Sequence, residues 1–129
     1  MTNRISLFKN KIKCLPWQIF SKFGFYKGNK IPVKFIIENA DWAIKFVGDN
    51  IKREIDTIAP GKLEVSTKPH KSVGSIVHFG SQYMWLNWGK YMANENKFVT
   101  SFFHGKPEDG PEVKRHIDLF LKSVGRLEK

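Results

Sequence analysis

The sequence predicts an α/β fold, with a parallel sheet of about four strands, flanking helices and a basic amphipathic helical leader. Short apolar runs alternate with stretches whose apolar residues repeat every three or four positions. Their order is strand, helix, strand, strand, helix, strand, helix, which is typical of a parallel sheet with helices on both faces. The 41% hydrophobic content of the 129 residues suits one globular domain with one core.

Several classes of protein are excluded by composition. The single cysteine, Cys14, excludes an internal disulfide and a multi-cysteine metal site, and it fits a reducing compartment. No uninterrupted apolar run approaches the ~18 residues of a membrane span. A secretory signal is not expected, because Lys9, Lys11 and Lys13 interrupt the early apolar stretch.

The net charge of +10 is concentrated near the amino terminus. Residues 1–37 hold eight Lys or Arg and no acid, whereas residues 38–129 hold 14 basic and 12 acidic residues, a net of +2. We therefore divide the chain into a basic aromatic leader and linker, residues 1–32, and a nearly neutral domain, residues 33–129. No specific nucleic-acid partner is expected for such a neutral domain.

The leader carries an apolar stripe at helical spacing, and Pro16 is expected to kink or divide that helix. Two interpretations remain open. A basic amphipathic helix with aromatic residues is typical of a membrane interface, and it predicts weak, reversible binding to anionic vesicles. Alternatively, the helix packs on the domain with its lysines in solvent. The stripe consists of Ile5, Phe8, Ile12, Leu15, Ile19 and Phe23.

The first part of the domain predicts a buried strand over residues 33–38 and an edge strand over residues 62–67. Between them, Asn39 or Asp41 can cap a helix that ends at Pro60-Gly61. The apolar stripe of this helix is Ile44, Val47, Ile51, Ile55 and Ile58. The turn before it has neither the glycine-rich dinucleotide fingerprint nor the P-loop pattern, which disfavours a nucleotide there.

The second part predicts a strand over residues 75–79, a short aromatic helix, a strand over residues 98–103 and a helix opening at Pro111. Asp109 or Gly110 can cap that last helix. We expect the strands beginning near Val33, Ser75 and Lys97 to be central in the sheet, and the one near Lys62 to lie at an edge.

The candidate site lies at the carboxyl ends of the strands, where open α/β sheets bind their ligands. The turn at Gly80-Ser81 and the loop over residues 104–110 should emerge on the same edge, near Asn39 and Asp41. Glycine in such a turn permits close approach of a ligand to the backbone. The loop holds most of the chemistry: His104, Gly105, Lys106, Glu108 and Asp109. An ordinary capped strand-to-helix connection remains the alternative, with helix capping favoured for Asp109.

The other histidines are less promising. His78 lies within a strand and fits a hydrogen-bonded core residue, while His70 and His116 are expected to be exposed to solvent. No set of His, Cys, Asp and Glu has convincing metal-ligand spacing, so no metal is expected. Cys14 lies in the leader, which disfavours a cysteine nucleophile.

Three stretches together resemble the amino-terminal half of bacterial glycosyltransferases of the GT-B architecture, which have two Rossmann-like domains. These are Asn39-Ala-Asp-Trp-Ala-Ile44, Val77-His-Phe-Gly-Ser81 and Thr100-Ser-Phe-Phe-His-Gly-Lys-Pro-Glu-Asp-Gly-Pro-Glu112. The resemblance covers roughly residues 33–127 and rests on strand-exit turns in the right order. It implies an acceptor-binding domain, whose active site is the cleft toward a carboxy-terminal donor-binding domain.

That second domain, with its Glu-rich donor motif, does not follow in this sequence, so the fold is expected to be an incomplete GT-B fold. The resemblance implies sugar transfer from a nucleotide-sugar to a glycan or glycolipid acceptor, as in cell-envelope polysaccharide synthesis, once a donor domain or second chain completes the site. This chain itself is expected to bind no cofactor and to be inactive alone.

Within this interpretation, His104, Glu108 and Asp109 are the candidate catalytic residues, with His104 or a carboxylate activating the acceptor hydroxyl. Asn39, Asp41, Gly80, Ser81, Gly105 and Lys106 are the candidate substrate-binding residues, and Lys106 can face a phosphate. The expected location is cytoplasmic, peripheral on the inner face of the membrane. The alternative function is a non-catalytic α/β module that binds an anionic membrane or nucleic acid through its leader.

Overall fold

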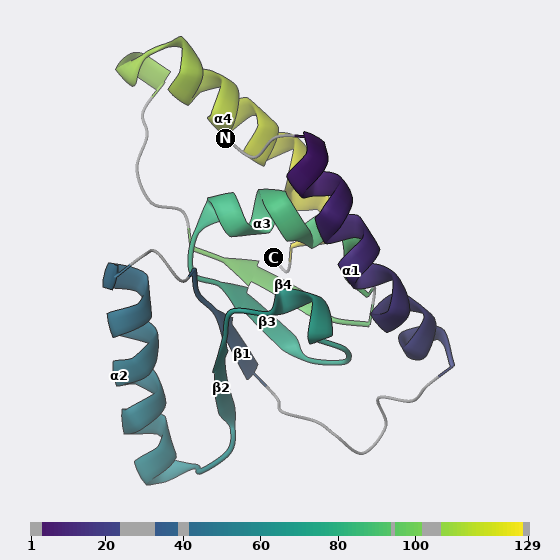
Figure 1. The fold of residues 1–129 in the computed structure, drawn as a ribbon. Coiled ribbons are helices and arrows are strands. Elements are labelled where there is room, and N and C mark those ends of the chain that lie inside the picture. The colour runs from purple at the N-terminus through teal and green to yellow at the C-terminus, as the bar shows by residue number, and fades with distance from the viewer. Residues whose placement is uncertain (1–3, 24–32, 39–41, 94, 102–106, 128–129) are drawn as a thin grey trace.

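The computed structural model describes residues 4–23, 33–38, 42–93, 95–101 and 107–127 (Figure 1). Four short 3-10 helices connect the main elements, at Pro69–Lys71, Gly89–Tyr91, Pro107–Asp109 and Val124–Arg126. The helices and strands are α1 (Arg4–Lys22), β1 (Val33–Ile36), α2 (Trp42–Ile58), β2 (Leu63–Ser66), β3 (Ile76–Phe79), α3 (Gln82–Trp88), β4 (Lys97–Thr100) and α4 (Pro111–Ser123). The molecule is therefore the predicted α/β fold, with a Rossmann-like arrangement.

The four strands form one parallel sheet in the order β2-β1-β3-β4. The edge position predicted for β2 and the central positions of β1 and β3 are confirmed. The prediction that β4 is central is wrong, because β4 is the last strand of this sheet. On its outer side, Leu127 makes a single parallel bridge to Phe98.

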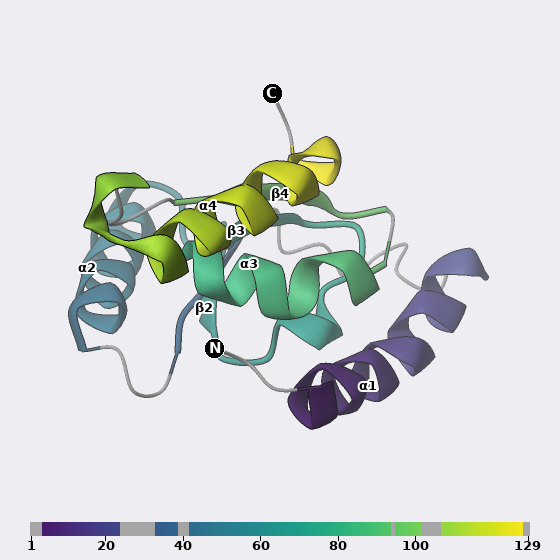
Figure 2. The ribbon, with the colours of Figure 1, turned by 90° about the horizontal axis from the view of Figure 1, so that it is seen from above.

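The helices are divided between the two faces of the sheet because side chains alternate along each strand. Phe35 and Ile37 point to the face that α2 covers, whereas Ile36 points to the other face. α3 packs on that second face, and α1 and α4 each contact α3. Viewed from above, α3 lies between α1 and α4 (Figure 2).

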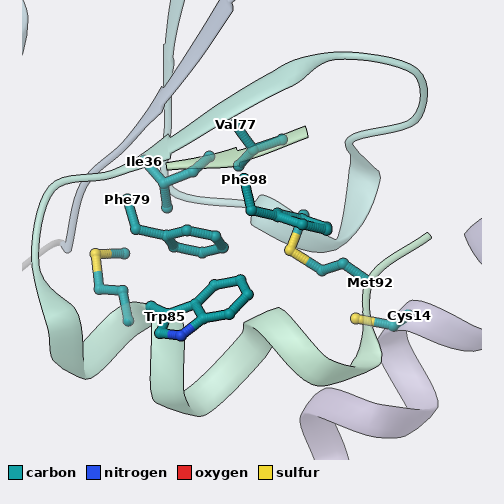
Figure 3. Packing of buried hydrophobic residues seen from close by; sticks show 8 residues of the cluster. Cys14, Ile36, Val77, Phe79, Trp85, Met92 and Phe98 are labelled. Carbon is teal, nitrogen blue, oxygen red and sulfur yellow. The ribbon is translucent and has the colours of Figure 1, made fainter. Parts of the chain in front are cut away.

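The larger core cluster fills the space between α3 and the sheet (Figure 3). Its aromatic rings pack edge-to-face and offset, with the centroids of Phe79 and Trp85 5.7 Å apart and those of Trp85 and Phe98 5.4 Å apart. Cys14 joins this cluster from α1. Burial of these large side chains is the main favourable term in folding, at about 25 cal/mol per Å² of apolar surface.

α2 is held to the sheet at close range. A Cβ placed on Gly48 would lie 3.0 Å from Cδ1 of Phe35, so any larger residue would require the Phe35 ring to shift by a few tenths of an ångström. Ile44 and Ile55 of the predicted stripe pack on the smaller cluster of Phe35, Ile37 and Leu63. The rest of that stripe, Val47, Ile51 and Ile58, is exposed.

α1 runs without interruption through Pro16, so the predicted division into two helices is wrong. Proline removes one N–H from the helix ladder. Contacts on both sides of Pro16 hold the helix against the domain, because Asn10 donates to the carbonyl of Asn87 and Gln18 donates to that of Tyr91.

Two predicted helix starts have different caps. The Ser81 hydroxyl accepts from the backbone N–H of Met84 at 3.5 Å and caps α3. At α4 the N-cap is Gly110, with a φ of 135° and no side-chain cap bond, so of the two predicted caps Gly110 is confirmed and Asp109, which was favoured, is wrong. Glycine tolerates this positive φ, which is the physical reason for its place at this helix start.

Candidate functional site

The carboxyl ends of the strands form one level edge. The backbone N–H of Gly80 donates to the carbonyl of Ile36 at 2.9 Å, and that of Ser101 donates to the carbonyl of Phe79 at 3.0 Å. The backbone N–H of Ile37 likewise donates to the carbonyl of Ser66 at 3.0 Å. These bonds continue the ladder one residue beyond each strand, so the exits of β1, β3 and β4 leave the sheet side by side.

This edge contains a topological switch point. From β1 the chain crosses through α2 to β2 on one side, and from β3 it crosses through α3 to β4 on the other. Because α2 and α3 cover opposite faces, the exits of β1 and β3 part in opposite directions. A crevice outside the strand ends at such a point is where open α/β sheets bind ligands.

Gly80 and Ser81 lie at this switch point, and both have structural tasks. A Cβ on Gly80 would lie 2.4 Å from Cγ2 of Ile44 and 2.9 Å from the carbonyl oxygen of Ile36. The space beside Gly80 is thus filled by protein, so its glycine is explained by packing. Ser81 is buried and caps α3.

The predicted catalytic carboxylates, Glu108 and Asp109, lie in the short 3-10 helix before α4, and both are exposed. Their exposure makes both side chains accessible at the outer surface of this connection. His104, Gly105, Lys106, Asn39 and Asp41 lie outside the described residues, so their predicted roles stay predictions.

A polar pair that the sequence did not single out lies near the same edge. Nε2 of His78 is 2.9 Å from Oγ of Ser101. His78 is half-buried, and burial lowers the pKa of its imidazole, which favours the neutral ring at pH 7. The sheet register brings the two residues together, because His78 pairs with Val99 and Ser101 follows on the same face two residues later. The expectation of a hydrogen-bonded histidine in a strand is confirmed.

A groove of about 910 Å³ lies elsewhere, between α1, α3 and α4. Its lining is mainly apolar and includes Leu7, Leu86 and Leu119, with Lys90 and Lys122 among the residues around it. An apolar groove with ammonium groups suits an apolar chain that carries an anionic group. Tyr83, which lines the groove, is two residues from Ser81.

His116 also lines this groove, and the expectation that it is exposed is wrong. Its ring stacks on that of Tyr83, with 4.3 Å between the centroids. Burial and the nearby amino terminus lower the pKa of this imidazole. His70 is half-buried, and its ring stacks on Trp88 at 5.6 Å. Each of these two histidine rings stacks on an aromatic side chain, and these contacts reduce the exposure of both rings.

A metal site, a cysteine nucleophile and a membrane-spanning helix find little support in the described part of the chain. Its His, Cys, Asp and Glu residues form no group of three or more that could hold a metal ion. Burial raises the pKa of the Cys14 thiol to about 12, which keeps this sulfur protonated. None of the helices in the described ranges combines the length and the apolar character that crossing a bilayer requires.

No protein-family model, curated protein or solved structure matches the chain. The function that fits best is therefore inferred from the arrangement of the residues themselves, above all from the edge where the strands end.

Proposed function

We propose that this chain is the acceptor-binding part of a glycosyltransferase, which transfers a sugar from a nucleotide-sugar to a glycan or lipid-linked acceptor. The observation that carries the proposal is the switch point between β1 and β3. The exits of β1 and β3 part there at the carboxyl edge of the sheet, the usual place for a ligand in this fold class. The proposed site is this edge together with the loop before α4.

Glycosyl transfer requires a group that accepts the proton of the acceptor hydroxyl and donors that stabilise the departing phosphate. His104, Glu108 and Asp109 remain the proposed candidates for the base, and Lys106 is the proposed phosphate contact. Exposure of the two carboxylates supports this assignment, because an acceptor bound at the surface could reach them. The neutral imidazole of His78 could orient a sugar hydroxyl through Ser101.

The groove between α1, α3 and α4 favours a lipid-linked acceptor. Its apolar lining would accept a hydrocarbon chain, and the nearby lysines would meet a phosphate that joins lipid to sugar. Because Tyr83 is only two residues from Ser81, a lipid in the groove could present its sugar toward the strand ends. The nucleotide-sugar would be bound by a donor domain, in the same protein or in a second chain.

The test is an NMR titration of the ¹⁵N-labelled full chain with hexose mono- and disaccharides, and separately with a uridine diphosphate sugar. Saccharides should shift the amide signals of Glu38, Gly80, Ser81 and Ser101 at the strand ends. The nucleotide-sugar should cause little shift there, because its main site would lie in the donor domain. Glu108→Gln and Asp109→Asn are matched substitutions at two exposed positions. The loss of saccharide affinity in each variant would show which carboxylate contributes more to binding.

Two outcomes would contradict the proposal. The first is a set of saccharide-induced shifts confined to α2 or to the outer edge of β2, far from the switch point. The second is tight binding of the nucleotide alone at the strand ends, which would indicate a nucleotide-binding module instead of an acceptor domain.

A further inference from the structure

α1 is attached to the domain through its polar side. Asn10 donates to the carbonyl of Asn87, Gln18 to that of Tyr91, and the Ser21 hydroxyl to the carboxylate of Glu95. Cys14 is fully buried in the core between these contacts. With about 100° of rotation per residue, these four positions lie roughly 120° to 180° around the helix from Ile12. The buried side of this helix is therefore mostly polar.

The opposite side of α1 is apolar and faces away from the domain. The six residues of the predicted stripe, which we call the outer face, are between 43% and 72% exposed. All lie within about 60° of Ile12 around the helix axis. Figures 1 and 2 show α1 along one margin of the molecule. Such an outer face is the reverse of the usual amphipathic surface helix, whose apolar stripe faces the core. The outer face consists of Ile5, Phe8, Ile12, Leu15, Ile19 and Phe23.

Cations border the outer face on both sides. Lys9 and Lys13 lie about 60° to 100° from Ile12 in one direction, and three further cations lie about 80° to 100° away in the other. Those three are Arg4, Lys11 and Lys22, and residues 1–37 contain no acid at all. Long basic side chains at the border of an apolar face can extend to charged head groups while the apolar residues are immersed.

The domain extends this positive border. α1 packs on the 3-10 helix Pro69–Lys71, which adds Lys71 beside the leader. The pKa of His70 is lowered first by burial and then by the positive charges of Lys13, Lys71 and Lys68. These three lysines are therefore close enough to act on one ring, and they form one basic cluster at the side of α1.

We propose that the outer face of α1 docks the folded domain onto an anionic lipid bilayer, with the helix lying in the plane of the membrane surface. This proposal is independent of the proposed sugar transfer. An apolar strip of this length, about 27 Å from Ile5 to Phe23 at 1.5 Å per residue, matches an interfacial helix. A second copy of the chain is a poorer partner, because two outer faces in contact would bring their bordering cations together.

α2 provides a matched control within the same molecule. It also exposes large apolar residues, among them Phe46 and Ile58. Its charges balance, with three basic and three acidic residues between Trp42 and Ile58. An exposed apolar surface without a positive border should bind anionic lipid weakly, so α2 separates the effect of the outer face from simple hydrophobicity.

The test is co-sedimentation of the full chain with phosphatidylcholine vesicles that contain either no phosphatidylglycerol or about 30% of it. We expect binding to the anionic vesicles, and loss of most of it at about 1 M salt, where the Debye length falls to about 3 Å. Ile12→Glu and Ile19→Glu should each weaken partitioning at least about tenfold, since each removes several immersed carbons and adds a negative charge. Ile58→Glu, the control on α2, should leave partitioning unchanged. Circular dichroism of each variant checks that the fold is retained.

Three results would overturn the proposal. Equal binding of the Ile12→Glu and Ile58→Glu variants would show that the outer face is not the contact. Equal binding to neutral and anionic vesicles would remove the role of the cations. A stable dimer in analytical ultracentrifugation that Ile12→Glu dissociates would show that a second copy covers the outer face.

Discussion

The backbone N–H of Gly80 donates to the carbonyl oxygen of Ile36 across 2.9 Å, which joins the exit of β3 to the end of β1 at the switch point of the sheet. The same carbonyl oxygen would be only 2.9 Å from a Cβ at Gly80. One backbone contact thus fixes both the geometry of the proposed site and the residue type that the turn can accept.

Gly80→Ala should lower the free energy of unfolding by about 1–3 kcal/mol, because the added methyl group meets Ile44 and a backbone oxygen that cannot move away cheaply. Urea denaturation would measure the change. Gly125→Ala is the matched control, since nothing lies within 4 Å of a Cβ there. A Gly80→Ala protein as stable as the control would contradict the packing seen at this turn.

Asn96 should be among the most sensitive polar positions. Its buried side-chain amide accepts from the backbone N–H of Ser75 at 3.0 Å and donates to the carbonyls of Ser72 and Ala93 at 2.7 and 3.2 Å. Asn96→Ala would leave these backbone groups without their partner, at an expected cost of about 2–4 kcal/mol for the set. Thermal and urea unfolding would measure it.

The matched comparison for Asn96 is Asn96→Asp, which keeps the shape but replaces the donating NH2 by an oxygen. That oxygen would face two carbonyls, so Asn96→Asp should be no more stable than Asn96→Ala at neutral pH. Nearly wild-type stability of the aspartate variant would contradict the two hydrogen bonds that the Asn96 NH2 donates to these carbonyls.

Stability should fall as the pH drops below about 6.5, the ordinary pKa of histidine. Burial lowers the pKa of His78 in the folded state, so below pH 6.5 the unfolded chain binds the proton first. The contribution of neutral His78 is thus present above that pH and lost as the pH falls toward its folded pKa. Urea midpoints at pH 7.5 and 5.5 would show the decline.

His78→Gln should reduce that decline, because glutamine does not titrate while it can still hydrogen-bond Ser101. Part of the slope should remain, since the pKa values of His70 and His116 are lowered as well. An unchanged slope in the His78→Gln protein would contradict a lowered pKa of this ring in the folded state.

Cys14 should react with thiol reagents only when α1 leaves the domain. Its sulfur is fully buried, and a pKa of about 12 leaves almost no thiolate at pH 8. Labelling with a disulfide reagent should therefore be slow in the native protein and fast in guanidinium chloride. Gln18→Ala removes a contact that holds α1 and should speed labelling, whereas the exposed substitution Ile58→Glu should not. Rapid labelling of the native protein would contradict the packing of α1.

Local patterns were sufficient for much of the fold. Apolar runs at strand spacing and stripes at helical spacing predicted four strands and their helices, because these periods are properties of the backbone itself. The polar alternation at residues 62–67 predicted the edge strand. Parallel pairing then required the strand exits to share one edge, and this edge is where the sequence predicts a ligand site.

Three features depended on contacts between segments far apart in the chain. β4 lies at the edge of the sheet although its sequence is as apolar as that of a central strand, and among the described residues only Leu127 bridges to its outer side. His116 is buried because Tyr83 stacks on it. The His78–Ser101 pair forms only when β3 and β4 align. No local pattern contains such partners.

The difference between what the sequence predicts and what the tertiary structure decides is clearest in the leader. The sequence by itself predicted a helical leader with one apolar side and cations along its borders, although it also predicted a kink or division at Pro16. Only the tertiary structure decided which side meets the domain, since hydrogen bonds from Asn10, Gln18 and Ser21 and the burial of Cys14 all lie on the polar side. The physical reason is that helical periodicity fixes the angles between side chains but contains no information about which of those angles the rest of the protein occupies.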